Sequence, residues 1–171
     1  MEHPNESYEY PTFLTLVCGS RSLVQRPGGE AWARHIIECI TDHANLVVTG
    51  DAPGPDTWVQ ERIARTSIRC VVFSLDGTVR EGADGREIGR WCPAERVSSG
   101  SRWPLVRNTA MVRAVARRAR MGRLAAVYAL KDPLSRTDGT GQTVREARRA
   151  GLQTWVETWS AAQAAEGMRA G

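Results

Sequence analysis

Short apolar runs alternate along the chain with stretches that have helical spacing. The apolar runs lie at residues 13–18, 46–49, 68–74, 124–130 and 152–156. They are apolar on both faces, which predicts buried strands of a parallel sheet. The stretches at 30–43, 56–66, 105–120 and 139–150 repeat apolar residues at the period of a helix. This alternation predicts an α/β fold: a doubly wound, mostly parallel sheet of about five or more strands with helices on both faces.

The length of 171 residues fits one domain that can bury its own core. We expect a polar lead-in over residues 1–12, one domain over 13–159 and a C-terminal tail over 160–171. Residues 75–102 interrupt the alternation, because they are rich in glycine and charge and have no sustained period. We expect them to form an irregular insertion, and a connection of this length is usually functional or mobile.

Composition and charge narrow the class of partner. A hydrophobic content of 42% with 25% charged residues is typical of a globular protein. The net charge is +4, and Lys131 is the only lysine, so the basic excess is almost all arginine. Arginine binds phosphate in bidentate fashion, although a GC-rich genome would produce the same bias. Arg113, Arg117 and Arg120 share a helix face that would fit nucleic-acid phosphates, but a solvated outer face is the commoner explanation.

Metal, cofactor and membrane partners are not expected. The four cysteines (Cys18, Cys39, Cys70 and Cys92) lack the close pairs that a zinc site requires. The three histidines lie in the polar lead-in or in and beside the segment 30–43, away from the glycine segments described next. Since the sequence shows no signal peptide and no apolar run of membrane length, we expect a cytoplasmic protein with reduced thiols.

Three glycine-bearing segments each follow a predicted strand: 18–21 (Cys-Gly-Ser-Arg), 50–56 (Gly-Asp-Ala-Pro-Gly-Pro-Asp) and 138–143 (Asp-Gly-Thr-Gly-Gln-Thr). In open α/β sheets, ligands lie beyond the carboxyl ends of the strands. Glycine lets the backbone approach a phosphate, and a helix N-terminus offers free N–H groups to it. Three such segments in a small chain predict a nucleotide-type ligand.

The first two segments offer groups for a phosphate and a ribose. We expect the Ser20 hydroxyl and the Arg21 guanidinium to hold a phosphate or ribose, with a plain turn as the alternative. Asp51 is placed against a ribose hydroxyl, with the backbone of Gly50 beside the ligand. We interpret Asp56 as the N-cap of the following helix.

Two further groups of residues open predicted helices. Arg107 and Asn108 lie in the first turns of the segment 105–120, where an arginine beside free N–H groups can clamp a phosphate. In the third glycine segment the backbone amides and the hydroxyls of Thr140 and Thr143 can surround an oxyanion. It is not a P-loop, because Gly-Lys-Ser/Thr is absent. Glu146 follows about one turn later and is the candidate catalytic carboxylate.

The order of these motifs resembles the SLOG superfamily of Rossmann-like proteins, from about Phe13 to Val156. This group includes the Lonely Guy phosphoribohydrolases, the lysine-decarboxylase-like proteins and DNA-processing protein A; the small single-domain, YspA-type branch is the most similar. The resemblance implies a Rossmann-like fold and a pocket for a nucleotide or nucleotide-derived ligand. The residues that it places in this pocket are Gly19, Ser20, Arg21, Gly50, Asp51, Arg107, Asn108, Gly139 and Thr140, and we add Thr143.

The same resemblance bears on catalysis. The hydrolases of the superfamily cleave the N-glycosidic bond of nucleoside monophosphates with a glutamate in their last motif, and Thr143 stands at the matching position here. A threonine cannot stabilise an oxocarbenium-like centre as a carboxylate does. Glu146 could take this role if the helix turned it inward. We therefore expect a ligand-binding sensor or a weak N-glycosidic hydrolase.

Two alternatives remain open. Residues 103–108 are similar to the Phe-Pro-x-Arg-Asn-Arg segment of DNA-processing protein A, which would imply binding of single-stranded nucleic acid. Thr109 replaces the second arginine of that segment. The other alternative is an active nucleoside 5'-monophosphate phosphoribohydrolase. Relatives are often dimers, and Trp91, Trp103, Trp155 and Trp159 could supply a homodimer interface or pack in the core.

Overall fold

The structure is a computed structural model that describes residues 13–75, 94–100 and 103–162. The predicted lead-in over 1–12, most of the insertion over 75–102 and most of the tail over 160–171 lie outside the described residues. Trp91 also lies outside them. Within the described residues, no helix has the length and apolar character needed to cross a membrane.

The described strands form one six-stranded sheet in the order β4-β3-β2-β1-β5-β6, and every neighbouring pair is parallel. This confirms the prediction of an α/β, Rossmann-like sheet. The central strands are continuous apolar runs because both of their faces are covered. The strands are β1 (Phe13–Gly19), β2 (Leu46–Thr49), β3 (Arg69–Ser74), β4 (Glu95–Ser98), β5 (Leu124–Lys131) and β6 (Gln153–Thr158).

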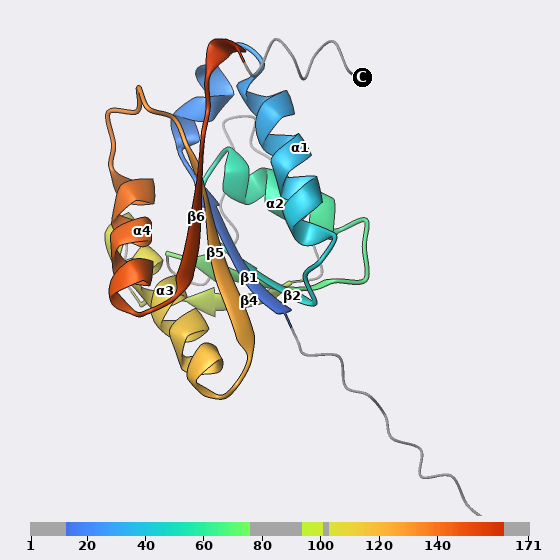
Figure 1. Cartoon of the computed structure of the whole chain (residues 1–171), viewed down its shortest axis with the longest axis vertical. Helices are drawn as coiled ribbons and strands as arrows, with labels where there is room; N and C mark the ends of the chain where they lie inside the picture. Colours follow the sequence, from blue (N-terminus) through green and yellow to red (C-terminus); the bar gives the residue numbers. More distant parts are fainter. Residues whose placement is uncertain (1–12, 76–93, 101–102, 163–171) are drawn as a thin grey trace, which may run out of the picture.

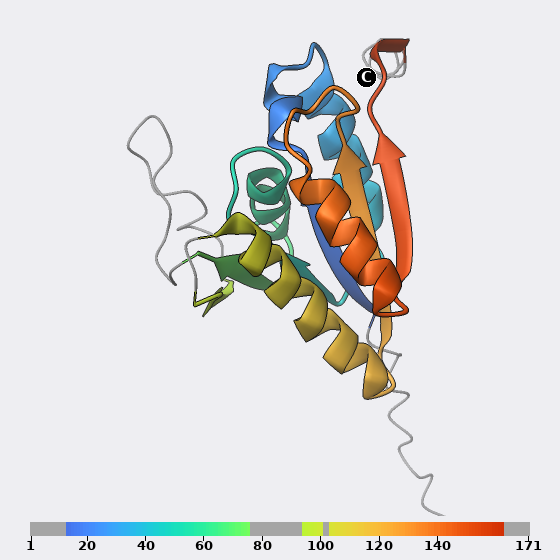
Figure 2. The same cartoon turned by 90° about the vertical axis from the view of Figure 1, so that its left-hand side faces the viewer.

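Helices cover the sheet from both sides, as Figures 1 and 2 show. The helices α1 (Gly29–Thr41) and α2 (Pro55–Ile63) pack on one face through a core that includes Ile37, Val59 and Val72. The helices α3 (Pro104–Arg120) and α4 (Gly139–Arg149) pack on the other through a core that includes Met111 and Val144. The alternation of faces along each strand assigns neighbouring side chains to the two cores.

The strand order reverses at β1, and this reversal positions the candidate site. From β1 the chain proceeds outward through β2 and β3 on one side, whereas β5 and β6 lie on the other side. Gly19, at the end of β1, is in register with Leu130 near the end of β5. At such a switch point the loops separate and leave a crevice. The loops after β1 and β5 and the N-termini of α3 and α4 all meet there.

Three local predictions differ from the structure. Strand β4 lies within the segment expected to be irregular; it is short and partly exposed, so it lacks the apolar signal of the buried strands. A 3-10 helix, η1 (Arg21–Gln25), lies between the predicted strand 13–18 and the predicted helix 30–43, where the sequence predicted no regular element. Helix α2 begins at Pro55 with Gly54 as N-cap, so the N-cap role predicted for Asp56 is wrong. Proline presets the helical φ at the first position, which starts the helix one residue earlier.

Candidate functional site

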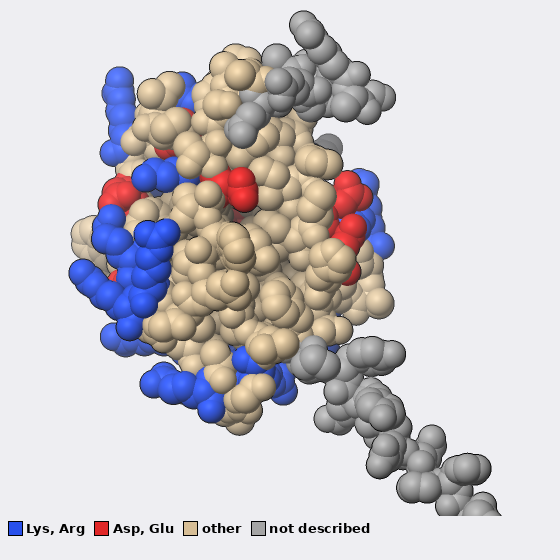
Figure 3. Space-filling model, in the orientation of Figure 1, with Lys and Arg blue, Asp and Glu red and all other residues tan. Residues whose placement is uncertain are grey.

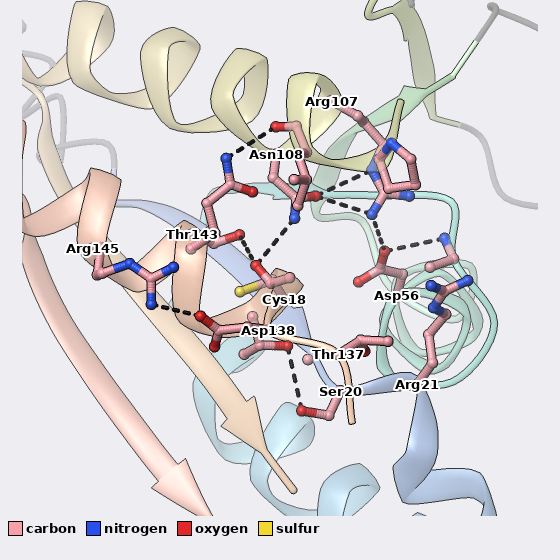
Figure 4. A pocket seen from close by; sticks show the side chains of 17 residues that line it. Cys18, Ser20, Arg21, Asp56, Arg107, Asn108, Thr137, Asp138, Thr143 and Arg145 are labelled. Carbon is pink, nitrogen blue, oxygen red and sulfur yellow. Dashed lines mark hydrogen bonds and ion pairs between the residues drawn. The ribbon is translucent and has the colours of Figure 1, made fainter. Parts of the chain in front are cut away.

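A cavity of about 420 Å³ opens at the carboxyl edge of the sheet, within the range of small-molecule sites. Figure 4 shows its lining: side chains reach it from the end of β1, from α3, from α4 and from the loop before α4. The lining residues are Cys18, Gly19, Ser20, Arg21, Ala52, Asp56, Pro104, Leu105, Arg107, Asn108, Thr137, Asp138, Gly139, Thr140, Gln142, Thr143 and Arg145.

The turn after β1 brings Ser20 and Arg21 to the cavity. The backbone N–H of Ser20 donates to the carbonyl of Leu130 at 2.9 Å, which fixes this turn to β5. The Ser20 hydroxyl accepts a hydrogen bond from the backbone N–H of Asp132 at 3.1 Å and lies 3.4 Å from the Thr140 hydroxyl. Arg21 lines the cavity and forms no ion pair with any residue that the structure describes.

The N-terminus of α4 continues the cavity wall that Ser20 and Arg21 form, because the Thr140 hydroxyl lies next to that of Ser20. Asp138 is its N-cap residue, but its carboxylate makes no capping hydrogen bond and pairs instead with Arg145 at 2.6 Å. The first turn of α4 contains no acidic residue. The first N–H groups of a helix lack partners inside it, and they carry the positive end of the helix dipole. This end of α4 therefore offers donors to an anion in the cavity.

Arg107 anchors another wall through a buried network of charges. Its Nη1 donates to Asp51 Oδ1 at 2.6 Å, and its Nη2 lies 3.7 Å from Asp56 Oδ2. All three residues are at most 6% exposed. Asp56 Oδ2 also accepts the backbone N–H of Ala52 at 3.1 Å. One guanidinium thus serves two buried carboxylates, and the network joins α3 to the loop after β2.

Asn108 links the two helix N-termini at the cavity. Its side-chain oxygen accepts from Arg107 Nη2 at 3.1 Å, and its Nδ2 donates to the carbonyl of Gly139 at 3.2 Å. The Thr143 hydroxyl donates to the same carbonyl at 3.1 Å. These bonds fix the first turns of α3 and α4 relative to each other, so the donors that face the cavity are held in place.

Cys18 lies at the floor of the cavity, where Figure 4 shows its sulfur near Thr143. Burial, reinforced by the negative charge of Asp56, raises the pKa of the Cys18 thiol to about 12. A thiol with a pKa this high stays protonated at neutral pH, which disfavours a role as nucleophile.

Asp132 supports the site from behind, although nothing in the sequence marked it. Its carboxylate accepts hydrogen bonds from the Ser22 hydroxyl at 2.6 Å, from Arg26 Nε at 2.8 Å and from the backbone N–H of Leu134 at 2.9 Å. Burial acts to raise the pKa of this carboxyl, but these three donors outweigh it and lower the pKa. The arrangement connects the loop after β5 to η1.

The structure brings most of the predicted site residues to one cavity. Those that line it are Gly19, Ser20, Arg21, Arg107, Asn108, Gly139, Thr140 and Thr143. Gly50 and Asp51 do not line it, because Asp51 lies behind Arg107 as its ion-pair partner. Glu146 does not line it either: its carboxylate accepts from the Thr109 hydroxyl at 2.9 Å and from Gln142 Nε2 at 3.0 Å, in the contact between α3 and α4.

Sequence reasoning missed several lining residues. Asp138 and Gln142 lie within the third glycine segment, Arg145 follows it on α4, and Pro104 and Leu105 precede Arg107 on α3. A signal was available, because a helix that starts at a site presents its whole first turn to it. Within the described residues, no group of three or more His, Cys, Asp or Glu side chains is arranged to hold a metal ion.

Comparison with solved structures supports the fold. The X-ray structure of TM1055, a structural-genomics target, superposes with a TM-score of 0.58 at 14% identity, over 84% of this chain and 72% of that one. The X-ray structure of DNA processing protein A from Streptococcus pneumoniae gives a TM-score of 0.59 at 16% identity, over 95% of this chain.

Both superpositions confirm the Rossmann-like α/β fold that the sequence resemblance implied. This chain spans 56% of the DNA processing protein A chain. No family model and no curated protein matches the sequence.

Proposed function

We propose that the protein binds a nucleotide or nucleotide-derived ligand in the cavity at the carboxyl edge of the sheet. One observation carries this proposal: Arg21 and the N-terminus of α4 lie at the same cavity. Arg21 has no ion-pair partner among the described residues, and the N-terminus of α4 has no side-chain cap. Both face one cavity of about 420 Å³, large enough for a small ligand.

The phosphate end of the ligand is assigned to the wall that Ser20, Arg21, Gly139 and Thr140 form. A guanidinium presents a fork of donors that matches a phosphate, and the helix N-terminus adds backbone donors and a positive dipole end. There is room at this wall beside Gly139, since a Cβ there would meet its nearest neighbour, Asn108 Nδ2, at 3.6 Å, an ordinary van der Waals distance. The positive charge of Arg107 is already matched by Asp51 and Asp56, so Arg21 is the main cation for the phosphate.

The rest of the ligand is assigned to the less polar part of the cavity. Ala52, Pro104 and Leu105 supply apolar surface there, which suits the flat face of a base. Asn108 and Asp56 also line the cavity, and their side-chain oxygens offer acceptors to the hydroxyl groups of a ribose. This combination of surfaces favours a nucleoside phosphate over inorganic phosphate alone.

The proposal is for binding without efficient hydrolysis of an N-glycosidic bond. Thr143 lines the cavity where the similar hydrolases have a carboxylate, and the Glu146 carboxylate is engaged between α3 and α4. We expect wild-type protein to release no free base from AMP in an assay by liquid chromatography. Base release that disappears in Glu146→Gln would contradict this part of the proposal.

Calorimetric titration tests the binding. AMP should bind more tightly than adenosine, because adenosine lacks the phosphate that Arg21 and the α4 N-terminus would hold. Arg21→Ala should weaken the binding of AMP by about 1.5–3 kcal/mol, the scale of a hydrogen bond to a charged group. The affinity for adenosine should stay unchanged.

The matched control is Arg136→Ala, which removes an exposed arginine from the same edge of the molecule without touching the cavity. Its affinity for AMP should equal that of the wild type. Equal losses in Arg21→Ala and Arg136→Ala would show that general charge, not the cavity, attracts the ligand. Failure of wild-type protein to bind any of a panel of nucleoside monophosphates would overturn the proposal.

A further inference from the structure

The two helix-covered faces of the molecule differ in how many of their arginines form ion pairs. On the side of α1 and α2, Arg34 pairs with Glu30 and Glu61, and Arg62 pairs with Asp42 and Glu38, whereas Arg65, just beyond α2, forms no ion pair with a described residue. On the side of α3 and α4, six exposed arginines form no ion pair with any described residue. We call them the α3–α4 arginine face: Arg113, Arg117, Arg120, Arg123, Arg148 and Arg149.

Acidic residues are few on this side, and one of them, Asp138 at the N-cap of α4, is paired with Arg145. Helix α3 contains no Asp or Glu over its whole length. Helix α4 contains one, Glu146, whose carboxylate is engaged by Thr109 and Gln142. A genome that favours arginine codons would raise arginine on every face, and it would not remove the carboxylates from one of them. Ordinary helix surfaces intersperse both signs of charge.

The geometry of the two helices gathers these charges on one surface. Both helices begin at the cavity and pack against each other as they run away from it, as Figure 2 shows. Thr109 contacts Glu146 across their seam, and one turn further along each helix come Arg113 and Arg149. Figure 3 shows Lys and Arg side chains gathered on the edge of the molecule where α3 and α4 lie.

We propose that the α3–α4 arginine face binds the sugar-phosphate backbone of nucleic acid, independently of the small-molecule cavity. Guanidinium groups bind phosphates in bidentate fashion, and a row of them matches a row of phosphates. Arg113 to Arg120 covers roughly 10 Å along the helix axis at 1.5 Å per residue. That is the length occupied by about three phosphates of one strand.

Anionic lipid is the competing polyanion, and the structure disfavours it. A helix that lies in a membrane surface buries an apolar face in the lipid. Here the apolar faces of both helices are already used in the core, through residues such as Met111, Val115 and Ala147. Exposed apolar residues remain at the two ends of α3, with Leu105 and Val106 near its start and Met121 just beyond its end, but the surface between them carries Arg113, Arg117 and Arg120. Contacts to the backbone alone carry no sequence information, so binding to nucleic acid should be independent of sequence.

Fluorescence anisotropy with a labelled oligothymidylate and a labelled mixed-sequence duplex tests this proposal. The affinity should fall as salt rises, with log K declining by about 0.7 per phosphate contacted on a single strand. The triple variant Arg113→Gln, Arg117→Gln and Arg149→Gln should bind at least tenfold more weakly and should reduce the salt slope by about 2. Comparing the affinities for the oligothymidylate and the duplex shows whether single-stranded or double-stranded nucleic acid is preferred.

The matched control is Arg65→Gln, Arg69→Gln and Arg136→Gln, three exposed arginines outside the α3–α4 arginine face. It changes the net charge by the same amount and should bind nucleic acid like the wild type. Equal weakening in both triple variants would overturn the proposal, as would wild-type protein that binds vesicles containing phosphatidylglycerol but neither oligonucleotide. AMP binding should survive in both triple variants, which separates failure of this proposal from failure of the cavity proposal.

Discussion

Arg107 is buried beside two carboxylates, so the main effect of its charge is to stabilise the folded state and not to bind a ligand. Removing one partner of a buried ion pair leaves uncompensated charge in a medium that solvates it poorly. We expect Arg107→Ala to lower the free energy of unfolding by about 3–5 kcal/mol. Urea denaturation followed by circular dichroism measures this change. The exposed Arg113→Ala serves as control and should stay within about 0.5 kcal/mol of the wild type.

The partner variant Asp51→Asn distinguishes the ion pair from simple packing. It keeps the shape of the side chain and removes the charge that Arg107 Nη1 contacts at 2.6 Å. If charge pairing is the cause, Asp51→Asn should also destabilise the protein, and the double variant should lose less than the sum of the two single losses. Additive losses would show that Arg107 and Asp51 contribute separately.

Gly50 and Gly139 offer a second test at the scale of single residues. A Cβ on Gly50 would collide with the Asp56 carboxylate and lie 2.9 Å from Arg107 Cζ, whereas a Cβ on Gly139 would meet only Asn108 Nδ2, at 3.6 Å. Gly50→Ala should therefore cost about 1–3 kcal/mol of stability, the usual range for overpacking. Gly139→Ala should be neutral or stabilising, because alanine is the better helix former. Thermal unfolding of both variants measures the two changes. Equal shifts of Tm in Gly50→Ala and Gly139→Ala would contradict the prediction.

The sequence identified these residues but not their roles. Glycines, Asp51 and Arg107 were recognisable because each follows a strand or opens a helix. The ion pair between Arg107 and Asp51 was not recognisable, since the two residues are 56 positions apart and meet only when the topology brings α3 over β2. An arginine that clamps a ligand and one that neutralises a buried carboxylate look the same in sequence.

At the scale of elements, Asp132 connects the loop after β5 to η1. Because its donors lower the pKa of its carboxyl in the folded protein, the contribution to stability is present above the unfolded pKa, near 3.8, and is lost as pH falls below it. We expect Asp132→Asn to lower the free energy of unfolding at pH 7 by about 1–2 kcal/mol, the scale of the lost hydrogen bonds. The difference in the free energy of unfolding between Asp132→Asn and the wild type should become smaller as the pH is lowered below the unfolded pKa. Denaturation curves across this range measure it, and a difference that widens in acid would contradict it.

The elements themselves were largely predictable. Buried parallel strands are continuous apolar runs, so β1, β2, β3 and β5 were found within one residue at each end. Strand β4 was missed because an exposed edge strand of four residues, Glu-Arg-Val-Ser, has neither a run nor an alternation that is long enough to detect. Helix α2 was misplaced at its start because Pro55 and Asp56 are both good first-turn residues.

At the scale of the whole molecule, the site depends on strand order, which local patterns do not specify. The reversal at β1 places the loop after β5 next to the loop after β1, although more than a hundred residues separate Ser20 from Asp132. Handedness of parallel crossovers restricts the possible orders. The motif resemblance implied a Rossmann-like fold without stating the order of its strands, and the superposition on solved structures supports that fold.

Since the cavity walls come from β1, α3 and α4, a ligand that contacts all of them should stabilise the entire fold. AMP at about one hundred times its Kd should raise the free energy of unfolding by about 2.7 kcal/mol, because it binds only the folded state. Hydrogen exchange should show the strongest added protection at the amides of residues 20–21 and 139–141, with less at α1 and α2. Arg21→Ala at the same AMP concentration should gain much less stability, since weaker binding reduces the coupling. If AMP stabilised the wild type and Arg21→Ala to the same extent, the ligand would be bound elsewhere. Only at a site that includes Arg21 does loss of this side chain weaken AMP binding and so reduce the stabilisation that AMP provides.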